Sequence, residues 1–241
     1  MKKKRIDIML PVYHGNLNEI PESIEKQVKY FSETLKEYDW KIVLAINGKN
    51  AEKVIDLAKQ LGKRDNRITY DYVEQSGKGS GIIHAWSKSK ADIISYMDID
   101  LSTDIRDFPD LILQIEKGYD ISIGSRYLPK SKVKRSFKRR IISFTYHKIF
   151  MKIILGAKRY TDGQCGFKAV NRRVREELLP LIKNKSWFFE SEMLYIAQLK
   201  GFKIKEIPVN WVESDFSGIL LYKAILEFIK YGIGIRFRKI P

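Results

Sequence analysis

Strand-type apolar segments alternate with segments of helical spacing over the first 125 residues. The strand-type segments are residues 6–12, 40–46, 67–73, 92–97 and 119–123. Helical spacing covers residues 20–38, 51–61, 82–89 and 108–116. Strands and helices that alternate at this rhythm form a parallel sheet with crossover helices. The sequence therefore predicts an α/β protein.

The rhythm changes after residue 130. An apolar helix is expected over 141–155, a loop and a strand over 162–170, and helices over 172–181 and 190–199. Residues 202–211 alternate like a strand, and Pro208 within them suggests a sheet edge or a bulge. A final helix is expected from Gly218 onward.

The chain carries a large positive charge. Its 45 Lys and Arg residues exceed its 29 Asp and Glu residues, which gives a formal net charge of +16. Residues 130–140, KSKVKRSFKRR, contain seven cationic side chains and no acidic one. Such an excess favours a polyanionic partner: a nucleic acid, an anionic membrane or a phosphorylated substrate.

Simple counts exclude other classes of protein. Cys165 is the only cysteine, which excludes an intramolecular disulfide and a cysteine-cluster metal site and suits a reducing cytoplasm. The basic start MKKKR is not followed by the apolar segment of a signal peptide. No stretch reaches the roughly 18 uncharged apolar residues of a membrane span. A globular cytoplasmic protein is therefore expected.

Two carboxylates follow the fourth expected strand. Asp98 and Asp100 lie two residues apart, so they point the same way on an extended chain. Carboxylate oxygens select Mg²⁺ or Mn²⁺, and ligands of an open α/β sheet bind beyond the carboxyl ends of its strands. The pair can therefore share a divalent cation that holds a diphosphate. Alternatively, an Asp-x-Asp triplet caps a following helix.

Three further segments combine element ends with glycine or cationic residues. Residues 77–81 (GKGSG) lie between a strand and a helix, where a backbone can approach an anion, or they form a plain turn. Arg126 follows the fifth strand and can reach a phosphate with its planar fork, or it is an ordinary surface arginine. Arg139 and Ser143 share a helix face that suits a phosphate, unless they lie in a solvated basic loop.

In order and spacing, these segments resemble the family 2 glycosyltransferases, and most closely the dolichyl- or polyprenyl-phosphate glucosyl- and mannosyltransferases. The resemblance spans about residues 5–212. Its motifs are LPVY (10–13), GKG (77–79), YMDIDLS (96–102), IGSRY (123–127), RRIIS (139–143), DGQCGFK (162–168), FESE (189–192) and GFKIKEIPV (201–209). It implies a GT-A (Rossmann-like) fold with a mostly parallel central sheet flanked by helices, and amphipathic helices at the C-terminus. It also implies inverting transfer of a hexose, glucose or mannose, from a UDP- or GDP-sugar to a polyprenyl phosphate.

The resemblance also implies the site residues. The metal ligands for Mg²⁺ or Mn²⁺ are Asp98 and Asp100, and the catalytic set adds Arg126. The residues expected at the nucleotide-sugar are Pro11, Tyr13, Asn47, Lys78, Asp98 and Asp100. The residues expected at the acceptor phosphate are Arg126, Arg139, Ser143 and Gln164. An ionised lipid phosphate is itself the nucleophile, so no general base is required. For a sugar hydroxyl, Glu190 is the candidate base; alternatively, Glu190 and Glu192 are structural and hold the acceptor loop.

Several positions depart from the family pattern. His14-Gly15 and Ile46-Asn47 replace acidic residues that commonly contact the nucleoside, and Ser102 stands where mannosyl members have a metal-binding Gln. An arginine is absent after Trp211. Base specificity stays open, and so do three alternatives: a saccharide acceptor, a non-catalytic relative and a basic nucleic-acid-binding module. The last leaves the two aspartates unexplained, and no nucleic-acid partner is expected.

The chain is expected to divide into three parts. Residues 1–128 form the nucleotide-sugar-binding half of a GT-A domain, 129–218 its acceptor-binding half, and 219–241 an amphipathic helix. The helices over 141–155 and 220–237 are too interrupted by charge to span a bilayer, but they can lie in the interface on anionic headgroups, or pack on the core. A peripheral position at the cytoplasmic face of a membrane is expected, with a separate membrane protein as a further candidate partner.

Overall fold

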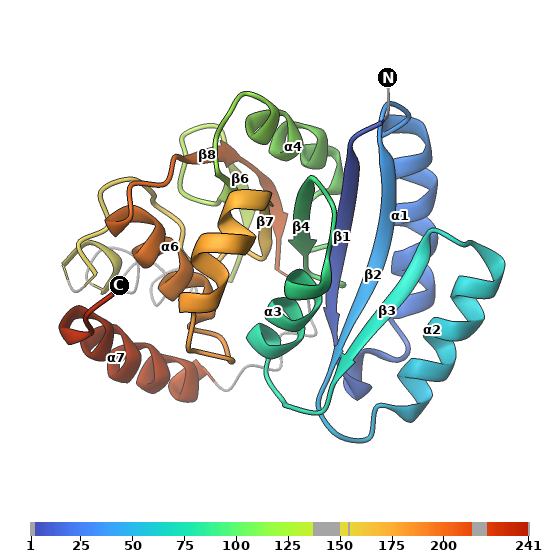
Figure 1. Cartoon of the computed structure of the whole chain (residues 1–241), viewed down its shortest axis with the longest axis horizontal. Coiled ribbons are helices and arrows are strands. Elements are labelled where there is room, and N and C mark those ends of the chain that lie inside the picture. The colour runs from blue at the N-terminus through green and yellow to red at the C-terminus, as the bar shows by residue number, and fades with distance from the viewer. Residues whose placement is uncertain (1–2, 137–149, 154, 214–220, 241) are drawn as a thin grey trace.

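The computed structural model describes residues 3–136, 150–153, 155–213 and 221–240. Within these ranges, one seven-stranded sheet has the order β3-β2-β1-β4-β7-β5-β8 (Figure 1). Four neighbouring strands are parallel: β1 (Arg5–Val12), β2 (Asp39–Asn47), β3 (Ile68–Val73) and β4 (Ile93–Met97). β5 (Ile121–Ser125) and β8 (Ile204–Pro208) are also parallel to each other, and β7 (Phe167–Asn171) joins the two groups in the antiparallel direction. The predicted α/β class and mostly parallel sheet are confirmed.

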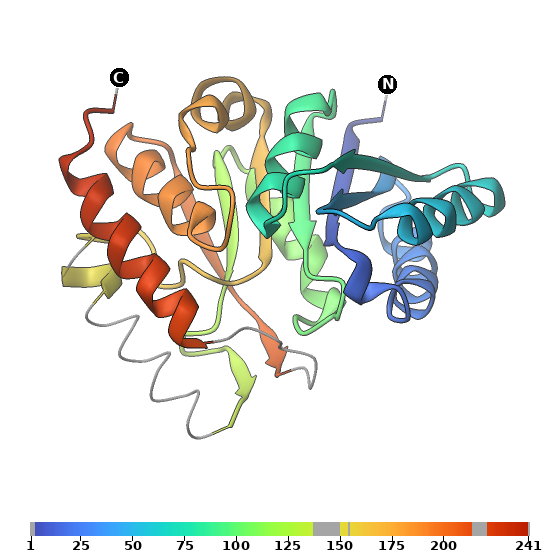
Figure 2. The same ribbon diagram turned by 90° about the horizontal axis from the view of Figure 1, so that it is seen from below.

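Apolar side chains cover both faces of the sheet, because alternate residues of a strand point to opposite sides. On one face, α1 (Ile20–Thr34), α2 (Glu52–Arg64) and α4 (Phe108–Glu116) form a core with Ile8 and Leu44. On the other, α3 (Lys78–Lys88), α6 (Phe189–Leu199) and α7 (Leu221–Phe237) contribute to a core with Met9 and Tyr96. Figure 2 shows α3 and α6 on one side of the sheet and α1 and α4 on the other. Residue Asp98, two positions after Tyr96, therefore faces α3 and α6.

The start of α3 differs from the sequence prediction. The helix begins at Lys78 instead of residue 82, so two glycines expected in a loop lie in its first turns. A Cβ on Gly79 would lie 2.9 Å from the Phe189 side chain, and one on Gly81 would lie 2.9 Å from the Ala45 carbonyl oxygen. These glycines therefore allow α3 to pack closely on its neighbours.

Two other segments are more broken than the sequence indicates. The helix expected over 172–181 is a π-helical turn, η4 (Val174–Leu178), followed by a 3-10 turn, η5 (Leu179–Leu181), because Pro180 lacks the N–H that would continue a regular helix. The strand expected over 202–211 ends as β8 at Pro208, and β9 (Asn210–Val212) pairs with β6 (Lys132–Lys134) in a second sheet. β8 is an edge strand, as Pro208 predicted. The helix expected over 141–155 lies mostly outside the described residues.

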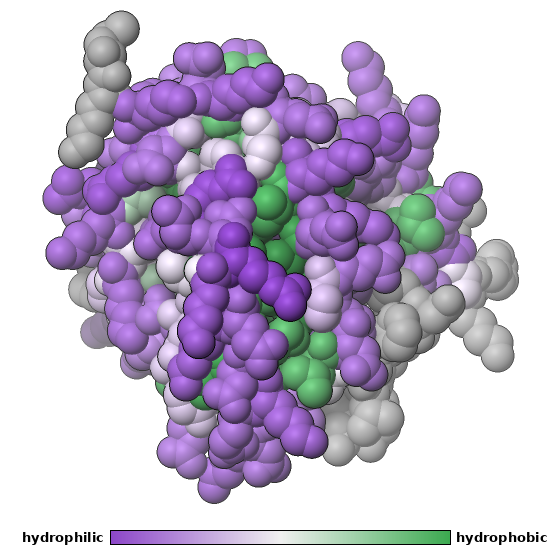
Figure 3. Space-filling model, turned by 90° about the vertical axis from the view of Figure 1, so that its right-hand side faces the viewer, coloured by the Kyte–Doolittle hydropathy of each residue, from purple (hydrophilic) through white to green (hydrophobic). Residues whose placement is uncertain are grey.

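Short turns and the outer surface complete the described structure. η1 (His14–Asn16) follows β1, and η2 (Ile105–Asp107) leads into α4. The side of the molecule that carries α2 is mainly hydrophilic, with a narrow apolar band (Figure 3). None of the helices in the described ranges is long and apolar enough to cross a membrane.

Candidate active site

The two predicted metal ligands follow β4. Asp98 keeps 39% of its side chain exposed at the end of this strand. The backbone N–H of Ser102 donates to Asp100 Oδ1 over 2.9 Å. Leu101 between them has a φ of 53°, in the left-handed region that few residues with a side chain occupy. The chain therefore turns sharply after Asp100, which keeps both carboxylates beside the end of β4.

Gly166 fits closely against Asp98. The Asp98 N–H donates to the Gly166 carbonyl over 3.1 Å. A Cβ on Gly166 would lie 2.0 Å from Asp98 Oδ2, so any side chain at this position would displace the carboxylate. β7 begins at the next residue and pairs with β4, so the second half of the chain supplies one wall of the site.

Lys78 connects Asp98 to a buried chain of charges. Its Nζ lies 2.7 Å from Asp98 Oδ1 and 3.1 Å from Glu190 Oε1. The other carboxylate oxygen of Glu190 lies 2.8 Å from Lys168 Nζ, and Lys168 also donates to the Cys165 carbonyl. The side chains of Glu190 and Lys168 are 2% and 0% exposed, so neighbouring charges must replace the water that each has lost.

These neighbouring charges outweigh the effect of burial. Burial alone would raise the pKa of Glu190, but Lys168 and Lys78 lower it from 4.5 to about 2. Burial also opposes the charge on Lys78, yet Asp98 and Glu190 raise its pKa above the ordinary value. Glu190 is thus ionised, enclosed and paired with two lysines, and a carboxylate of such low pKa is a weak base. This environment does not favour Glu190 as a general base.

Backbone N–H groups at the start of α3 donate hydrogen bonds within the protein. The N–H of Ser80 donates to the carbonyl of Lys185 over 2.8 Å, and that of Gly79 to the carbonyl of Ser186 over 3.3 Å. Of the two interpretations given for this segment, anion binding through the backbone is the one that these contacts do not favour, because a distant loop takes the two donors. The Lys78 side chain is the group that this segment directs toward the end of β4.

Three residues expected at the nucleotide-sugar lie at the ends of β1 and β2: Pro11, Tyr13 and Asn47. Asn47 is 7% exposed; its Nδ2 donates to the Val12 carbonyl over 3.1 Å and its Oδ1 accepts from the Gly77 N–H over 3.1 Å. It therefore ties the end of β1 to the start of α3. Pro11 is half-buried within β1, whereas Tyr13, just beyond that strand, is 48% exposed.

A second cluster lies beyond β5. Arg126 Nε and Nη2 lie 2.7 and 2.8 Å from the two carboxylate oxygens of Asp162. Burial alone would raise the pKa of Asp162, but Arg126 outweighs it and holds the pKa well below the ordinary value of 3.8. Gln164 donates its N–H to Asp162 over 3.0 Å and its Nε2 to Ser191 Oγ over 2.7 Å. Residues 162–166 thus connect Arg126 with Gly166 and Asp98.

Arg135 and Trp211 were not among the residues predicted at the site. The guanidinium carbons of Arg135 and Arg126 lie 4.5 and 5.4 Å from the centre of the Trp211 ring. β6 and β9 produce this grouping because Val133 is paired with Trp211. No local sequence motif predicts a pairing between residues that lie so far apart in the chain. Arg139 and Ser143, the other two residues predicted at the acceptor phosphate, lie outside the described residues.

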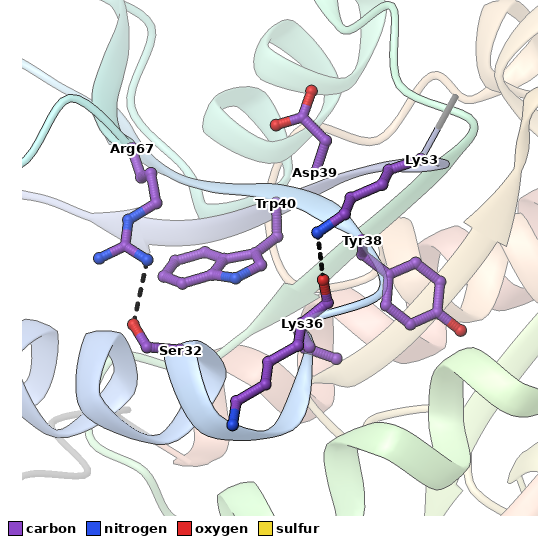
Figure 4. A pocket seen from close by; sticks show the side chains of 8 residues that line it. Lys3, Ser32, Lys36, Tyr38, Asp39, Trp40 and Arg67 are labelled. Atoms are coloured by element: carbon purple, nitrogen blue, oxygen red, sulfur yellow. Dashed lines mark hydrogen bonds between the residues drawn. The ribbon is translucent and has the colours of Figure 1, made fainter. Parts of the chain in front are cut away.

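A separate pocket of about 340 Å³ lies at the opposite end of β2 (Figure 4). Its Arg67 contacts Asp65 and Ser32 and covers the Trp40 ring at 4.3 Å. Lys3 donates to the backbone of Lys36. These contacts hold the start of β2 against α1, far along the strand from the end that carries Asn47.

A family model described as Glycosyl transferase family 2 matches residues 7–179. The chain belongs to this family. Glycosyltransferase AglD of Haloferax volcanii is 31% identical over 92% of this chain and 35% of its own length. Dolichyl-phosphate beta-glucosyltransferase of Dictyostelium discoideum is 28% identical over 97% of this chain and 74% of its own length. The chain thus spans about a third of the first relative and about three quarters of the second.

The fold of this family 2 member is similar to that of a solved enzyme. Glucosyl-3-phosphoglycerate synthase from Mycobacterium tuberculosis, crystallised with Mn²⁺, UDP and phosphoglyceric acid, superposes with a TM-score of 0.66. The match covers 96% of this chain and 79% of that chain at 13% sequence identity. The likeness confirms the predicted GT-A fold.

The donor atoms beside β4 suit a hard divalent cation. Asp98 and Asp100 provide carboxylate oxygens, the ligands that Mg²⁺ and Mn²⁺ prefer. Across the part of the chain that the structure describes, no three His, Cys, Asp or Glu residues are grouped so that they could hold a metal ion. These two carboxylates are the residues of the described site whose donor atoms fit such an ion.

Proposed function

We propose that this family 2 glycosyltransferase moves a hexose from a nucleotide-sugar to a polyprenyl phosphate at a membrane surface. The observation that carries the proposal is the arrangement of Asp98 and Asp100 beside β4 together with Arg126 and Arg135 at Trp211. Carboxylates suit a cation that holds a diphosphate, and guanidinium groups suit the phosphate of an acceptor. The name of the Dictyostelium relative supports glucose as the sugar and a dolichyl-type lipid as the acceptor.

The donor half is assigned to residues 1–128. Asp98 and Asp100 would hold Mg²⁺ or Mn²⁺, which when bound neutralises charge on the leaving diphosphate. The Mn²⁺ and UDP in the Mycobacterium enzyme support this assignment. Lys78 adds a cation beside the same carboxylate. Pro11, Tyr13 and Asn47 are proposed to form part of the nucleotide-sugar site, in which Asn47 holds the end of β1 to the start of α3.

The acceptor half is assigned to residues 129–218, with Arg126 at its border. Arg126, Arg139, Ser143 and Gln164 are proposed to hold the acceptor phosphate, and Arg135 is added to this set. A phosphate monoester is ionised at neutral pH and attacks without a base, so these residues need only position it and balance its charge. The enclosed state of Glu190 supports this acceptor over a sugar hydroxyl, which would need a base.

A donor and acceptor panel tests this proposal. The purified protein is incubated with UDP- and GDP-glucose and UDP- and GDP-mannose, a short polyprenyl phosphate, and Mg²⁺ or Mn²⁺. Glycolipid is expected with one nucleotide-sugar, and chelation of the metal should abolish it. Transfer to a free oligosaccharide with none to the lipid phosphate would overturn the acceptor, and absence of any transfer would overturn the proposed activity.

The membrane contact is assigned to α7. Leu226, Ile229, Ile233 and Phe237 recur at intervals of three or four residues and are 64%, 42%, 48% and 85% exposed. The opposite side of the helix packs on the core through Phe228 and Ile235. By helical spacing, Lys230 and Arg236 lie on either side of the exposed stripe. An apolar stripe between cations suits the surface of an anionic membrane at its cytoplasmic face.

Substitution of the stripe should detach the protein from lipid. Ile229→Asp/Ile233→Asp is expected to reduce sedimentation with phosphatidylglycerol vesicles by about tenfold or more, because two charges replace exposed apolar groups that would otherwise enter the membrane interface. Leu113→Asp, at a 40% exposed position on α4, is the matched control and should bind like wild type. Equal binding by the stripe variant and the control would contradict the assignment of α7.

A further inference from the structure

Lys78 is paired with one oxygen of a carboxylate that the proposed metal site needs. Its ammonium lies 2.7 Å from Asp98 Oδ1, and the Lys78 side chain is only 10% exposed. Two cations that share one carboxylate repel each other strongly where little water separates them. Before a divalent cation can bind this oxygen, the Lys78 ammonium therefore has to move away from it or remain close to a second positive charge.

The ammonium has a second anionic partner behind it. Glu190 Oε1 lies 3.1 Å from Lys78 Nζ, and Glu190 is itself anchored by Lys168 at 2.8 Å. The rings of Tyr96 and Trp187 lie 5.4 and 5.6 Å from the same ammonium. Lys78 can thus release Asp98 and still remain paired with Glu190, at the edge of the site.

We propose that Lys78 competes with the metal for Asp98 and thereby makes metal binding depend on the diphosphate of the donor. The proposal rests on the metal role assigned to Asp98 in the proposed function. When no diphosphate is bound, the metal ion and the Lys78 ammonium repel each other at Asp98. When the donor is bound, the negative oxygens of its diphosphate balance the charge of both cations. Glu190 is a positioning residue that retains the displaced ammonium. Because coupling between two ligands is reciprocal, the metal raises diphosphate affinity by the same factor.

Direct measurement of Mn²⁺ binding tests this coupling without any transfer reaction. Free Mn²⁺ is followed by electron paramagnetic resonance with and without UDP or GDP, and a protein-free series corrects for the Mn²⁺–nucleotide complex. In the absence of nucleotide, Lys78→Met should bind Mn²⁺ on the order of tenfold more tightly than wild type. The enhancement that the nucleotide gives to wild type should shrink by a similar factor.

A second variant should move in the opposite direction. In Glu190→Gln, Asp98 is the carboxylate partner that Lys78 keeps among the described residues, so Mn²⁺ affinity without nucleotide should fall below that of wild type. Lys88→Met removes the same charge from the exposed end of α3, where Lys88 pairs with Asp71 at 3.0 Å, and should leave Mn²⁺ affinity unchanged. Circular dichroism confirms folding, and Lys78→Gln replaces Lys78→Met if the latter does not fold.

The outcomes separate this proposal from the proposed function. Unchanged or weaker Mn²⁺ binding by Lys78→Met, or tighter binding by Glu190→Gln, overturns the competition. Asp100→Asn serves as the test of the metal site itself. If that variant binds Mn²⁺ as wild type does, the metal site of the proposed function is wrong whatever the lysine variants do.

Discussion

Asp100→Asn should lower the rate of hexose transfer by about 10²- to 10³-fold while the protein stays folded. The amide keeps the volume of the side chain, and its oxygen can still accept the Ser102 N–H that lies 2.9 Å from Asp100 Oδ1. It removes the negative charge with which the proposed site holds a divalent cation. Initial rates with the nucleotide-sugar that the panel selects, at fixed Mn²⁺ and lipid phosphate, measure the effect.

Asp104→Asn is the matched control for this loss. Asp104 lies four residues further on, where it accepts the Arg106 N–H over 2.9 Å and caps η2. The same loss of charge in the same loop should leave the transfer rate close to that of wild type. A fully active Asp100→Asn variant would show that this carboxylate holds no essential cation.

The local sequence pattern was enough to predict that Asp98 and Asp100 follow the carboxyl end of β4. The apolar run of β4 ends at Met97, and β4 pairs with β1 in the parallel direction through Met9 and Tyr96. Parallel strands end on the same side of the sheet, so the position of the pair follows from strand order and residue spacing. The confirmed α/β class with its mostly parallel sheet has the same origin in the alternation of strands and helices, whereas the GT-A fold was implied by the family resemblance.

Contacts between segments that lie far apart in the chain could not be predicted from local sequence patterns. β7 enters the sheet between β4 and β5, and it places Gly166 against Asp98 and Lys168 against Glu190. No periodicity in the sequence states which strands will be neighbours. For the same reason, the glycines before residue 82 were compatible with anion binding by the backbone. The sequence does not indicate that the carbonyl groups of residues 185–186 accept those N–H groups.

Arg126→Met should destabilise the protein by about 3–5 kcal/mol, because it leaves a buried carboxylate without its guanidinium partner. Arg126 and Asp162 are only 11% and 2% exposed, and two bonds of 2.7 and 2.8 Å join them. Arg106→Met breaks a similar pair with Asp104 at an exposed position and should change the free energy of unfolding little. Urea denaturation at neutral pH measures both variants.

The same pair should contribute to the sensitivity of the fold to acid. Burial alone would raise the pKa of Asp162, but Arg126 holds it well below 3.8 in the folded state. A carboxyl whose pKa is lowered by folding stabilises the fold above its unfolded pKa and loses that contribution as the pH falls. In Arg126→Met, burial raises the pKa of Asp162 without the opposing guanidinium, so this carboxyl takes up a proton at a higher pH in the folded variant than in wild type. The difference in unfolding free energy between wild type and Arg126→Met should therefore shrink as the pH falls and the variant becomes protonated. A difference that grows in acid would contradict the role of this pair.

A double variant separates the structural role of Arg126 from its proposed role at the acceptor phosphate. Arg126→Met/Asp162→Asn removes both charges. The single amide oxygen can still accept one of the two backbone N–H groups, those of residue 126 and Gln164, that bond to the two carboxylate oxygens of Asp162. It should regain most of the stability that Arg126→Met loses, because no unpaired buried charge remains. If Arg126 also contacts phosphate, transfer by the double variant stays low although the fold is restored. Recovery of both stability and transfer would mean that Arg126 supports the site only through Asp162.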